Sequence, residues 1–495
     1  MKFINLKIAF GSLILVLFVA SCGKDSLEIS PSTNNTSNDF YKDENQLNQG
    51  VIAAYNSLLT MPTNNWLMSD VRSDNMLEAF GGAQRDALDF GNFVNTSQTG
   101  AMQTTWSNLY NLVYRTNIVL EKIEAFSFTR VPQFKGELRF LRAMAYFDLV
   151  RYFGDVPLAT KVLTFEESKK IQREPAVNVY NQIIEDLKFA IANLPETYAA
   201  ADKGRVTKWA AKALLGRVYL TMYGYPLKQA DKLALAKAEF ADVIAKDASF
   251  PLATVYGDMF KAANDNKFYV FEIQYVAGGL GLGNPMANNQ AFQYPSQWSA
   301  YQPGIGFDAQ ISPALLKGWI NLDKRKFATL DTGYTDTKTG AKSARVQLTK
   351  FLEKGSTVPT AIGDQPNNFP LIRYEDVLLM QAEVLNEEAA TPPAQALTYL
   401  NRTRKRAGLA DTTIATKEGF RLALEQERQW EFVGEGLRWH DLVRTGRAIE
   451  VMNKHFKDNA VPLGRLIDEH DLLYPIPQKE LLINPGFWKQ NPGYN

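Results

Sequence analysis

FLRAMAYFDLVRYFGDVPL, residues Phe140–Leu158, is the stretch of sequence that decides the fold. It belongs to a helical pattern over Gln133–Phe153, in which apolar residues recur at steps of three and four. Gly154 can take a left-handed cap and Pro157 cannot continue a helix, so the pattern ends with a turn. The apolar stripe consists of Leu138, Leu141, Ala145, Leu149 and Tyr152. The sequence therefore predicts a helix that buries one face.

Similar patterns extend along the chain and are joined by short connections, which favour antiparallel neighbours. Near the C-terminus, Thr391 is a good N-cap and Gly408 ends the helix that it opens. Gly434 and Gly436 break the run Glu427–Gly446 into two helices. The other helices are predicted over Gln103–Phe126, Val177–Asn193, Thr207–Tyr223, Asp231–Lys246 and Leu371–Glu388. These patterns predict a mainly all-α protein built from helical hairpins.

One hairpin has the pattern of a degenerate tetratricopeptide repeat. Leu215-Gly216-x-x-Tyr219 matches a first repeat helix, and Ala236-x-x-x-Phe240 matches a second. Gly216 lets the neighbouring helix approach closely, and we expect Phe240 to fill the groove between the two helices.

The middle of the chain has a different character. In Lys267–Val276 apolar and polar residues alternate, with Glu272 and Gln274 on the polar face, which predicts a half-buried strand. Gly278–Asp308 and Asp331–Pro370 lack periodicity and read as long loops. Long loops in a compact domain usually carry function.

The N-terminus indicates where the chain works. Lys2 and Lys7 precede a short apolar run that ends in Val19-Ala20-Ser21-Cys22, which resembles the lipobox of bacterial lipoproteins. Residues 1–21 are thus predicted to be a signal peptide and Cys22 the lipidated first residue. The alternative is an ordinary signal peptide. Cys22 is the only cysteine, which excludes an intramolecular disulfide, a cysteine zinc site and a CxxC pair.

Composition limits the partners. Because Lys2 and Lys7 lie in the predicted signal, 52 of the 54 basic residues remain against 53 acidic ones. This balance provides no positive field for nucleic acid. No later segment is apolar enough to cross a membrane, so the sequence predicts a folded body held by a lipid tether.

Four stretches resemble the SusD/RagB lipoproteins of the Bacteroidota. They are FLRAMAYFDLVRYFGDVPL, YEDVLLMQAEVLNE (Tyr374–Glu387), ERQWEFVGEGLRWHDLVRTG (Glu427–Gly446) and YPIPQKELLINPGFWKQNPGY (Tyr474–Tyr494), in family order. The resemblance implies tetratricopeptide-like hairpins as a scaffold, loops and a few short strands as the ligand face, and a SusC-like TonB-dependent outer-membrane barrel as partner.

The resemblance also implies a domain organisation. Residues 22–40 would form a flexible tether and residues 41–495 a single SusD-like domain. That domain would comprise an N-terminal helical part (41–266), a loop-rich ligand-face part (267–370) and a C-terminal helical part (371–495). Lys24, Asp25 and Glu28 resemble the charged signals that send such lipoproteins to the outer cell surface.

Two stretches have the residues that an oligosaccharide receptor needs, namely flat aromatic faces beside amides, carboxylates and guanidinium groups. The predicted ligand contacts are Trp66, Asp70, Arg72, Asp74, Asn75, Asn289, Gln290, Tyr294, Trp298 and Tyr301. Each has a structural alternative, since Trp66 can anchor a loop to the core and the charged residues can form a local ion network. Trp106 and Trp209 are predicted core residues, and the cluster from Glu425 to Arg438 is predicted to be an ion network bracing helices.

Catalytic patterns are lacking in the sequence. The three histidines form no HExxH motif, and neither GxSxG nor GxGxxG is complete. We therefore expect no enzyme and no cofactor. The loops carry enough carboxylates for a structural calcium ion, but no EF-hand pattern supports one. The sequence predicts a surface-exposed lipoprotein that captures oligosaccharides for a transporter. A peptide receptor of the same uptake system and a helical-repeat adaptor without a ligand are the alternatives.

Overall fold

The computed structural model describes residues 40–78, 85–291, 309–335, 340–343, 346–353, 361, 363–461 and 465–494. The predicted signal peptide, Cys22 and the predicted tether up to residue 39 lie outside the described residues. The chain divides into two compact units, Met1–Gly50 and Val51–Asn495, and the second holds the helical scaffold. No helix in the described part of the chain is long and apolar enough to span a membrane.

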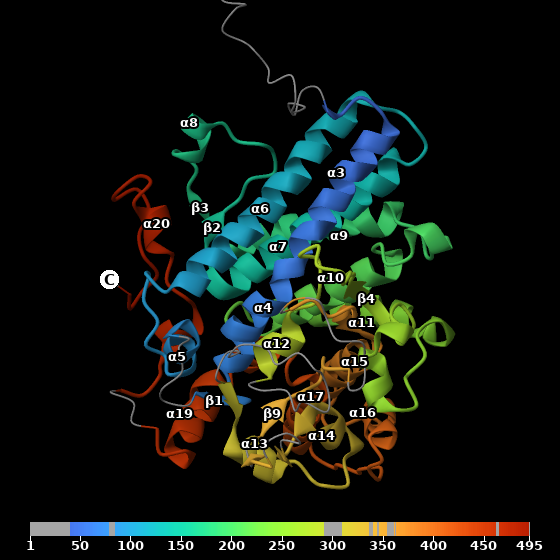
Figure 1. Ribbon diagram of the computed structural model, residues 1–495, viewed down its shortest axis with the longest axis vertical. Helices are drawn as coiled ribbons and strands as arrows, with labels where there is room; N and C mark the ends of the chain where they lie inside the picture. Colours follow the sequence, from blue (N-terminus) through green and yellow to red (C-terminus); the bar gives the residue numbers. More distant parts are fainter. Residues whose placement is uncertain are drawn as a thin grey trace, which may run out of the picture. The chain divides into compact units, whose positions relative to one another are not determined.

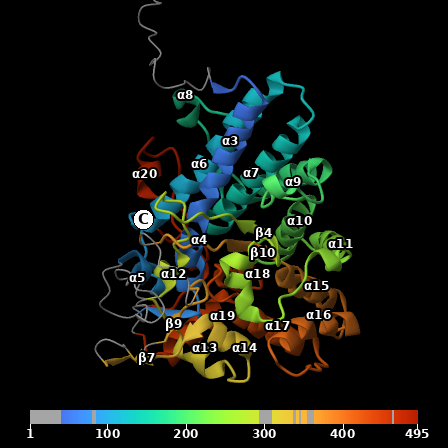
Figure 2. The ribbon, with the colours of Figure 1, turned by 45° about the vertical axis from the view of Figure 1, so that its right-hand side comes forward.

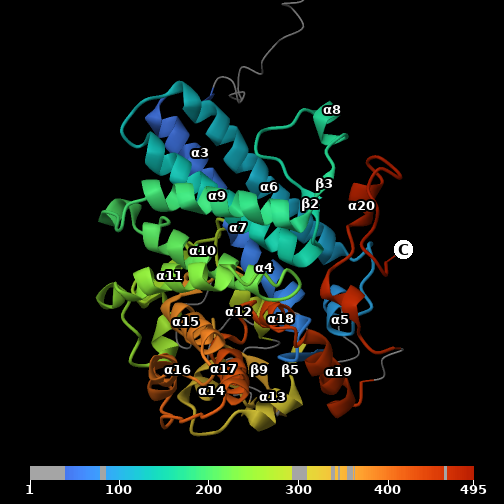
Figure 3. The same ribbon diagram turned by 180° about the vertical axis from the view of Figure 1, so that it is seen from behind.

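The scaffold of the second unit is a row of helices, each packed on the next. The row runs through α6 (Gly100–Lys122), α7 (Val131–Phe153), α9 (Ala176–Asn193), α10 (Lys208–Tyr223), α11 (Lys232–Ile244) and α15 (Tyr374–Glu388), which contacts α16 (Ala394–Arg406) and α17 (Lys417–Phe432). Figures 1 and 3 show this order from opposite sides. The predicted mainly helical fold is confirmed.

Shorter elements connect and cover this row. The helical ones are α3 (Glu44–Asn56), η2 (Ser57–Thr60), α4 (Met61–Asn65), η3 (Trp66–Val71), α5 (Arg85–Gly91), η4 (Ile123–Ala125), α8 (Phe165–Ser168), η5 (Ala200–Asp202), η6 (Asp247–Ser249), η7 (Tyr256–Phe260), η8 (Ala262–Asn264), α12 (Met286–Gln290), α13 (Pro313–Gly318), α14 (Lys324–Thr329), α18 (Arg438–Arg444), α19 (Ala448–Asp458), η9 (Glu469–Leu472) and α20 (Gln478–Leu481).

Local capping chemistry sets several of the helix ends. α7 ends at Phe153, where Gly154 takes a φ of +71°, and Thr207 Oγ1 accepts from Ala210 N at 3.3 Å to open α10. The predicted N-cap at Thr391 is wrong, because Pro393 is the N-cap of α16. Gly408 does end that helix, with a φ of +81° and its N–H donated to Lys405 O at 3.0 Å.

The predicted tetratricopeptide contact is present between α10 and α11. A Cβ atom on Gly216 would lie 2.5 Å from Phe240 Cε1, so the ring rests directly on the glycine. Phe240 is fully buried. The glycine thus sets the distance between the two helices.

α7 is buried on more than the predicted stripe because it lies between α6 and α9. Phe140 and Phe147 are in the core, and even Arg142 is buried. Arg142 donates to both carboxylate oxygens of Asp186 on α9, at 2.8 and 2.7 Å. A two-point pair of this kind satisfies a buried charge and fixes the alignment of the two helices.

The strands form short antiparallel pairs. They are β1 (Met76–Glu78) with β5 (Ala309–Ile311), β2 (Val156–Pro157) with β3 (Arg173–Glu174), β4 (Tyr269–Ile273) with β10 (Phe369–Arg373), β6 (Leu330–Asp331) with β9 (Gln347–Leu348), and β7 (Tyr334–Thr335) with β8 (Lys342–Ser343). Figure 2 shows β4 and β10 beside α10. Leu371 lies in β10, so the prediction that it starts a helix is wrong.

β4 differs from its prediction in one respect. It was expected to expose Glu272, but the strand is buried on both faces and Glu272 is 3% exposed. Burial and, to a lesser degree, the charge of Asp265 raise the pKa of Glu272 to about 8, against the opposing effect of hydrogen bonds such as that from Asn368.

Candidate functional site

The two stretches predicted to bind ligand meet in the fold. Thr63 on α4 and Asn289 on α12 are joined by a hydrogen bond in which Asn289 Nδ2 donates to Thr63 Oγ1 at 2.9 Å. Next to it, Gln290 Nε2 donates to Gly434 O at 2.6 Å. Residues 63 to 75, residues 286 to 290 and the turn between α17 and α18 thus form one cluster, called here the α4–α12 hub.

Two glycines make this close packing possible. Gly434 and Gly436 have φ values of +86° and +78°, a conformation that L side chains rarely adopt. A Cβ atom on Gly434 would lie 3.2 Å from the amide of Gln290, and one on Gly436 would lie 2.6 Å from Asn65 Cβ. The sequence predicts only that these two glycines break a helix. In the structure they also allow the α17–α18 turn to pack closely against α12 and α4.

The hub contains a buried carboxyl group. Asp70 accepts from Asn75 Nδ2 at 2.7 Å and from Gly436 N at 2.5 Å. Burial raises the pKa of Asp70 to about 6, and these hydrogen bonds oppose the shift. Asp70 is therefore a structural acceptor for the turn, with a proton affinity set by desolvation.

A buried lysine holds the same turn from the other side. Lys350 Nζ donates to Glu431 O, Val433 O and Glu435 Oε1 at 3.1, 2.9 and 2.7 Å. Burial lowers the pKa of Lys350 to about 8, while the charge of Glu435 opposes the shift. Three fixed acceptors around one ammonium group define the path of the backbone through Gly434.

The other predicted residues of the first stretch contact protein groups inside the fold. Trp66 is fully buried, and the Arg72 guanidinium lies 3.9 Å from the ring centre of Phe93 and 4.4 Å from that of Tyr474. Arg438 holds both oxygens of Asp74, at 2.7 and 2.8 Å.

The structure therefore places Trp66, Asp70, Arg72 and Asn75 inside the protein and Asp74 at its edge. A side chain without exposed surface has no face for a ligand. In this conformation these residues support the site and do not line it. Gln290 is likewise buried, and Asn289 is partly exposed.

The remaining predicted contacts, Tyr294, Trp298 and Tyr301, lie outside the described residues. The chain on either side of them is described. α12 ends at Gln290 in the hub, and β5 pairs with β1, which closely follows η3. After residue 308 the described chain thus resumes in a strand that pairs with β1, next to the hub in sequence.

Unsatisfied polar atoms gather in the hub. Within the described ranges, Trp66 Nε1, Asn64 Nδ2, Asn288 Oδ1 and Gln290 Oε1 are buried without a hydrogen-bond partner. The segment Trp66–Val71 is a π-helix, an arrangement that is rare and frequent at functional sites. Buried polar groups without partners require an explanation, of which a bound water or ligand is one. Sequence patterns gave no sign of either feature.

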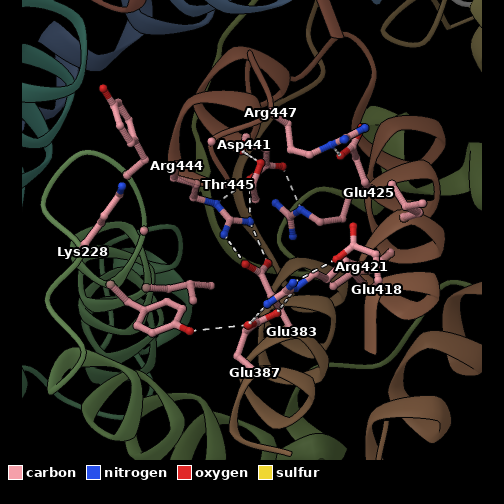
Figure 4. Close-up of a pocket in the computed structure, with 18 of the residues that line it drawn as sticks. Lys228, Glu383, Glu387, Glu418, Arg421, Glu425, Asp441, Arg444, Thr445 and Arg447 are labelled. Atoms are coloured by element: carbon pink, nitrogen blue, oxygen red, sulfur yellow. Dashed lines mark hydrogen bonds and ion pairs between the residues drawn. The ribbon is translucent and has the colours of Figure 1, made fainter. Parts of the chain in front are cut away.

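A separate cavity of about 710 Å³ lies among α10, the loop after it, α15, α17 and α18 (Figure 4). Several of its charged residues are paired across the space. Arg444 binds both oxygens of Glu383 at 2.5 and 2.8 Å, Arg421 binds those of Glu387 at 2.7 and 2.6 Å, and Arg447 binds Glu425 at 3.0 Å.

The ion pairs of this cavity change the pKa of an acidic residue, Asp441, that could otherwise be considered for acid–base catalysis. Burial acts to raise the pKa of Asp441, but Arg428 and Arg444 outweigh it and hold that pKa well below its usual value. A general acid or base needs a pKa near the operating pH, so Asp441 does not suit that role. Cavity residues in Figure 4 thus form a structural ion network.

The ion network predicted between Glu425 and Arg438 is confirmed. Arg325, fully buried, donates to Glu427 at 2.6 Å and to Glu431 at 2.9 Å. The other pairs are Arg428 with Asp376 at 2.6 Å, Arg373 with Glu435 at 2.6 Å, and Arg438 with Glu425 at 3.2 Å. Trp106 and Trp209, predicted to be core, are buried.

One group of metal-ligand type occurs in the described part of the chain. Asp468, His470 and Asp471 bring their ligand atoms within 4.8 Å of one another. Arg465 already binds Asp471 at 2.6 Å, so one of the two carboxylates of this group has a basic partner within the protein.

Comparisons with known proteins agree with this fold. A family model described as the SusD family matches residues 321–494, and one described as "Starch-binding associating with outer membrane" matches residues 25–220. A SusD-like protein of Formosa agariphila is 27% identical over the full length of both chains.

Solved structures give the same picture. A SusD superfamily protein of Parabacteroides distasonis is 25% identical, with a TM-score of 0.76 over 90% of this chain and 99% of that one. A laminarin-binding SusD-like protein is 27% identical, with a TM-score of 0.73 over 92% of this chain and all of that one.

Proposed function

The chain belongs to the SusD family, and from this premise we propose that it is a non-catalytic receptor that captures oligosaccharides at the outer membrane and passes them to a SusC-like TonB-dependent transporter. Association with the outer membrane accords with the family description. The laminarin-binding relative supports a carbohydrate ligand. Acylation of Cys22 would anchor the protein, and the charged residues after it favour the outer face.

The observation that carries the proposal is the convergence of the two predicted stretches at the α4–α12 hub. Partly exposed amides, such as those of Asn65 and Asn289, lie there. The segment 292–308, which contains Tyr294, Trp298 and Tyr301, follows directly after α12 in the sequence. Aromatic faces next to planar amides suit sugar rings, which present apolar faces and hydroxyl edges.

Burial of Trp66 favours the rival functions, because Trp66, one of the four predicted aromatic contacts, is absent from the surface. A peptide receptor would rely on backbone-directed polar groups, and an adaptor would bind no small ligand. We retain both as outcomes of the test.

The test is calorimetric titration of the mature chain with laminarin-type, xyloglucan-type and starch-type oligosaccharides and with peptide mixtures. Trp298→Ala is expected to weaken oligosaccharide binding by about 1–3 kcal/mol if Trp298 stacks on a sugar, by analogy with stacking on bases. Trp488→Ala is the control. Trp488 lies in the C-terminal tail, and its Nε1 donates to Ile171 O at 2.9 Å. Heat from peptides alone would establish a peptide receptor, and no heat from either class would leave the adaptor.

A further inference from the structure

Another cavity, of about 400 Å³, lies between the C-terminal end of α7, the start of α9, the loop after α10, α18 and the C-terminal tail. A volume of this size suits a small molecule. Three arginines, Arg151, Arg173 and Arg444, line the cavity, against one carboxylate among the described lining residues, that of Asp155. Two of the three, Arg151 and Arg444, form ion pairs within the protein.

Arg173 is the arginine of this cavity that has only uncharged acceptors. Its Nε donates to Asp155 O at 2.8 Å, one terminal nitrogen donates to Lys489 O at 2.7 Å, and the other donates to Asn491 Oδ1. The carboxylate of Asp155 is engaged at the start of α9, where its Oδ1 accepts from Ala176 N at 2.8 Å. Within the described ranges, Arg173 therefore has no carboxylate at ion-pair distance.

Arg444, which lines both this cavity and the one in Figure 4, shows the contrast. Burial acts to lower the pKa of Arg444, but Glu383 and Asp441 outweigh burial and raise that pKa. Burial also lowers the pKa of Arg173, and the charge of Asp155 offsets only part of that shift. Because an arginine stays protonated in proteins, Arg173 carries a charge that lacks a close counter-ion.

Two further side chains that line the cavity are buried and lack partners. Tyr180 is 6% exposed, and its hydroxyl makes no hydrogen bond to a described residue. His440 is 7% exposed, and its Nε2 is buried without a partner in the part of the chain that the structure describes. The charge of Arg151 acts on both groups, so the three side chains lie near one another. Buried polar groups without partners require an explanation, and a bound ligand is one.

All of these free groups can act as hydrogen-bond donors. Burial lowers the pKa of His440 well below its usual value, so the imidazole is neutral and can carry its one proton on Nε2. The Tyr180 hydroxyl donates one proton, and the guanidinium of Arg173 has five N–H groups. The complementary ligand therefore offers several acceptors and a negative charge.

We propose that this cavity binds a small organic carboxylate. The two oxygens of a carboxylate accept from a guanidinium and from hydroxyl or imidazole donors, and such charge-assisted bonds are the stronger ones. Val150, Leu227 and Leu473 also line the cavity and suit the organic body of such a ligand. None of the described lining residues belongs to the α4–α12 hub, so this site is additional to the proposed oligosaccharide site.

The experiment measures the heat of binding and the melting temperature of the mature chain with sodium glucuronate and with sodium N-acetylalaninate. Glucose, which lacks the carboxylate, and NaCl at matched ionic strength are the controls. No oligosaccharide is present, so the result is independent of the proposed function. With a dissociation constant of about 1 mM, 10 mM carboxylate should lower the equilibrium constant of unfolding about 11-fold.

Three variants locate the response. Arg173→Gln removes the charge that lacks a counter-ion and should abolish the response. Tyr180→Phe removes only an unpaired hydroxyl and should weaken binding about tenfold. Arg85→Gln, whose arginine side chain is 89% exposed on α5, should keep the native response. Arg173→Gln also loses bonds to the C-terminal tail, so Tyr180→Phe decides the case if that variant does not fold.

A saturable response to either carboxylate, weakened in Tyr180→Phe and kept in Arg85→Gln, establishes the site. The stronger of the two probes then shows whether a sugar acid or an amino-acid carboxylate fits better. The proposal is overturned if the native sequence responds to neither carboxylate, if glucose or NaCl has an equal effect, or if inorganic phosphate alone binds. Native affinity in Tyr180→Phe would overturn it as well.

Discussion

Replacing Gly436 by alanine tests whether the close contact between Gly436 and Asn65 holds the α17–α18 turn in the hub. Gly436 has a φ of +78°, and a Cβ atom there would lie 2.6 Å from Asn65 Cβ and 3.1 Å from the Asn65 carbonyl carbon. A left-handed alanine costs about 1–2 kcal/mol. Forcing a methyl group into a packed contact costs about 1–3 kcal/mol more. We expect Gly436→Ala to lower the free energy of unfolding by about 2–5 kcal/mol.

Gly446→Ala is the matched control. Its φ is +73°, but a Cβ atom on it would meet nothing within 4 Å. Gly446→Ala should therefore lower the free energy of unfolding only by the cost of a left-handed alanine, about 1–2 kcal/mol. Urea unfolding of both variants, analysed with the same dependence of the free energy on urea concentration, gives the difference between their free energies of unfolding. Equal losses in the two variants would refute the close-contact reasoning, because a Cβ atom on Gly436 would meet Asn65 and one on Gly446 would meet nothing.

Three further perturbations address the core and the hub. Phe240→Ala should cost about 3–5 kcal/mol in urea unfolding, because the ring fills the space over Gly216; a loss under 1 kcal/mol would contradict that packing. Arg325→Met should cost about 3–5 kcal/mol, since it strands buried carboxylates, and the exposed Lys405→Met should cost under 1 kcal/mol. The pKa of Asp70 is raised to about 6 in the folded protein, so the folded state binds this proton more tightly than the unfolded state does. The contribution of Asp70 therefore lowers the free energy of unfolding as the pH rises from about 4 to 6, by up to about 3 kcal/mol. Asp70→Asn should remove that slope from the urea midpoints, and an unchanged slope would show that Asp70 is not its source.

Helix positions were predictable because their signals are local. Gly154 and Thr207 mark ends of α7 and α10 through chemistry that involves only neighbouring residues. Leu371 was misassigned because the apolar residues before α15 continue its helical pattern. Their strand conformation depends on pairing with β4, about 100 residues earlier, and no local pattern contains that information.

The orientation of the candidate site residues could not be predicted from the sequence. The sequence identified both stretches that meet at the hub, from residue types suited to sugars. Those same types also build buried networks. Whether Arg72 faces a ligand or the interior depends on Phe93 and Tyr474, which come from distant parts of the chain. The same limit applies to Glu272, since alternation predicts two faces of a strand and not what covers them.

The buried charges explain how a helical scaffold can hold the hub in place. Carboxylates of the segment 425 to 435 pair with basic residues at positions 325, 350 and 373, which belong to separate parts of the chain. Breaking one such pair leaves a charge unpaired in the interior, so each resists local rearrangement. The segment that they fix continues directly into Gly434 and Gly436, which contact α12 and α4. The ion network thus sets the position of the hub from within, and loop sequences at the surface can vary without moving it.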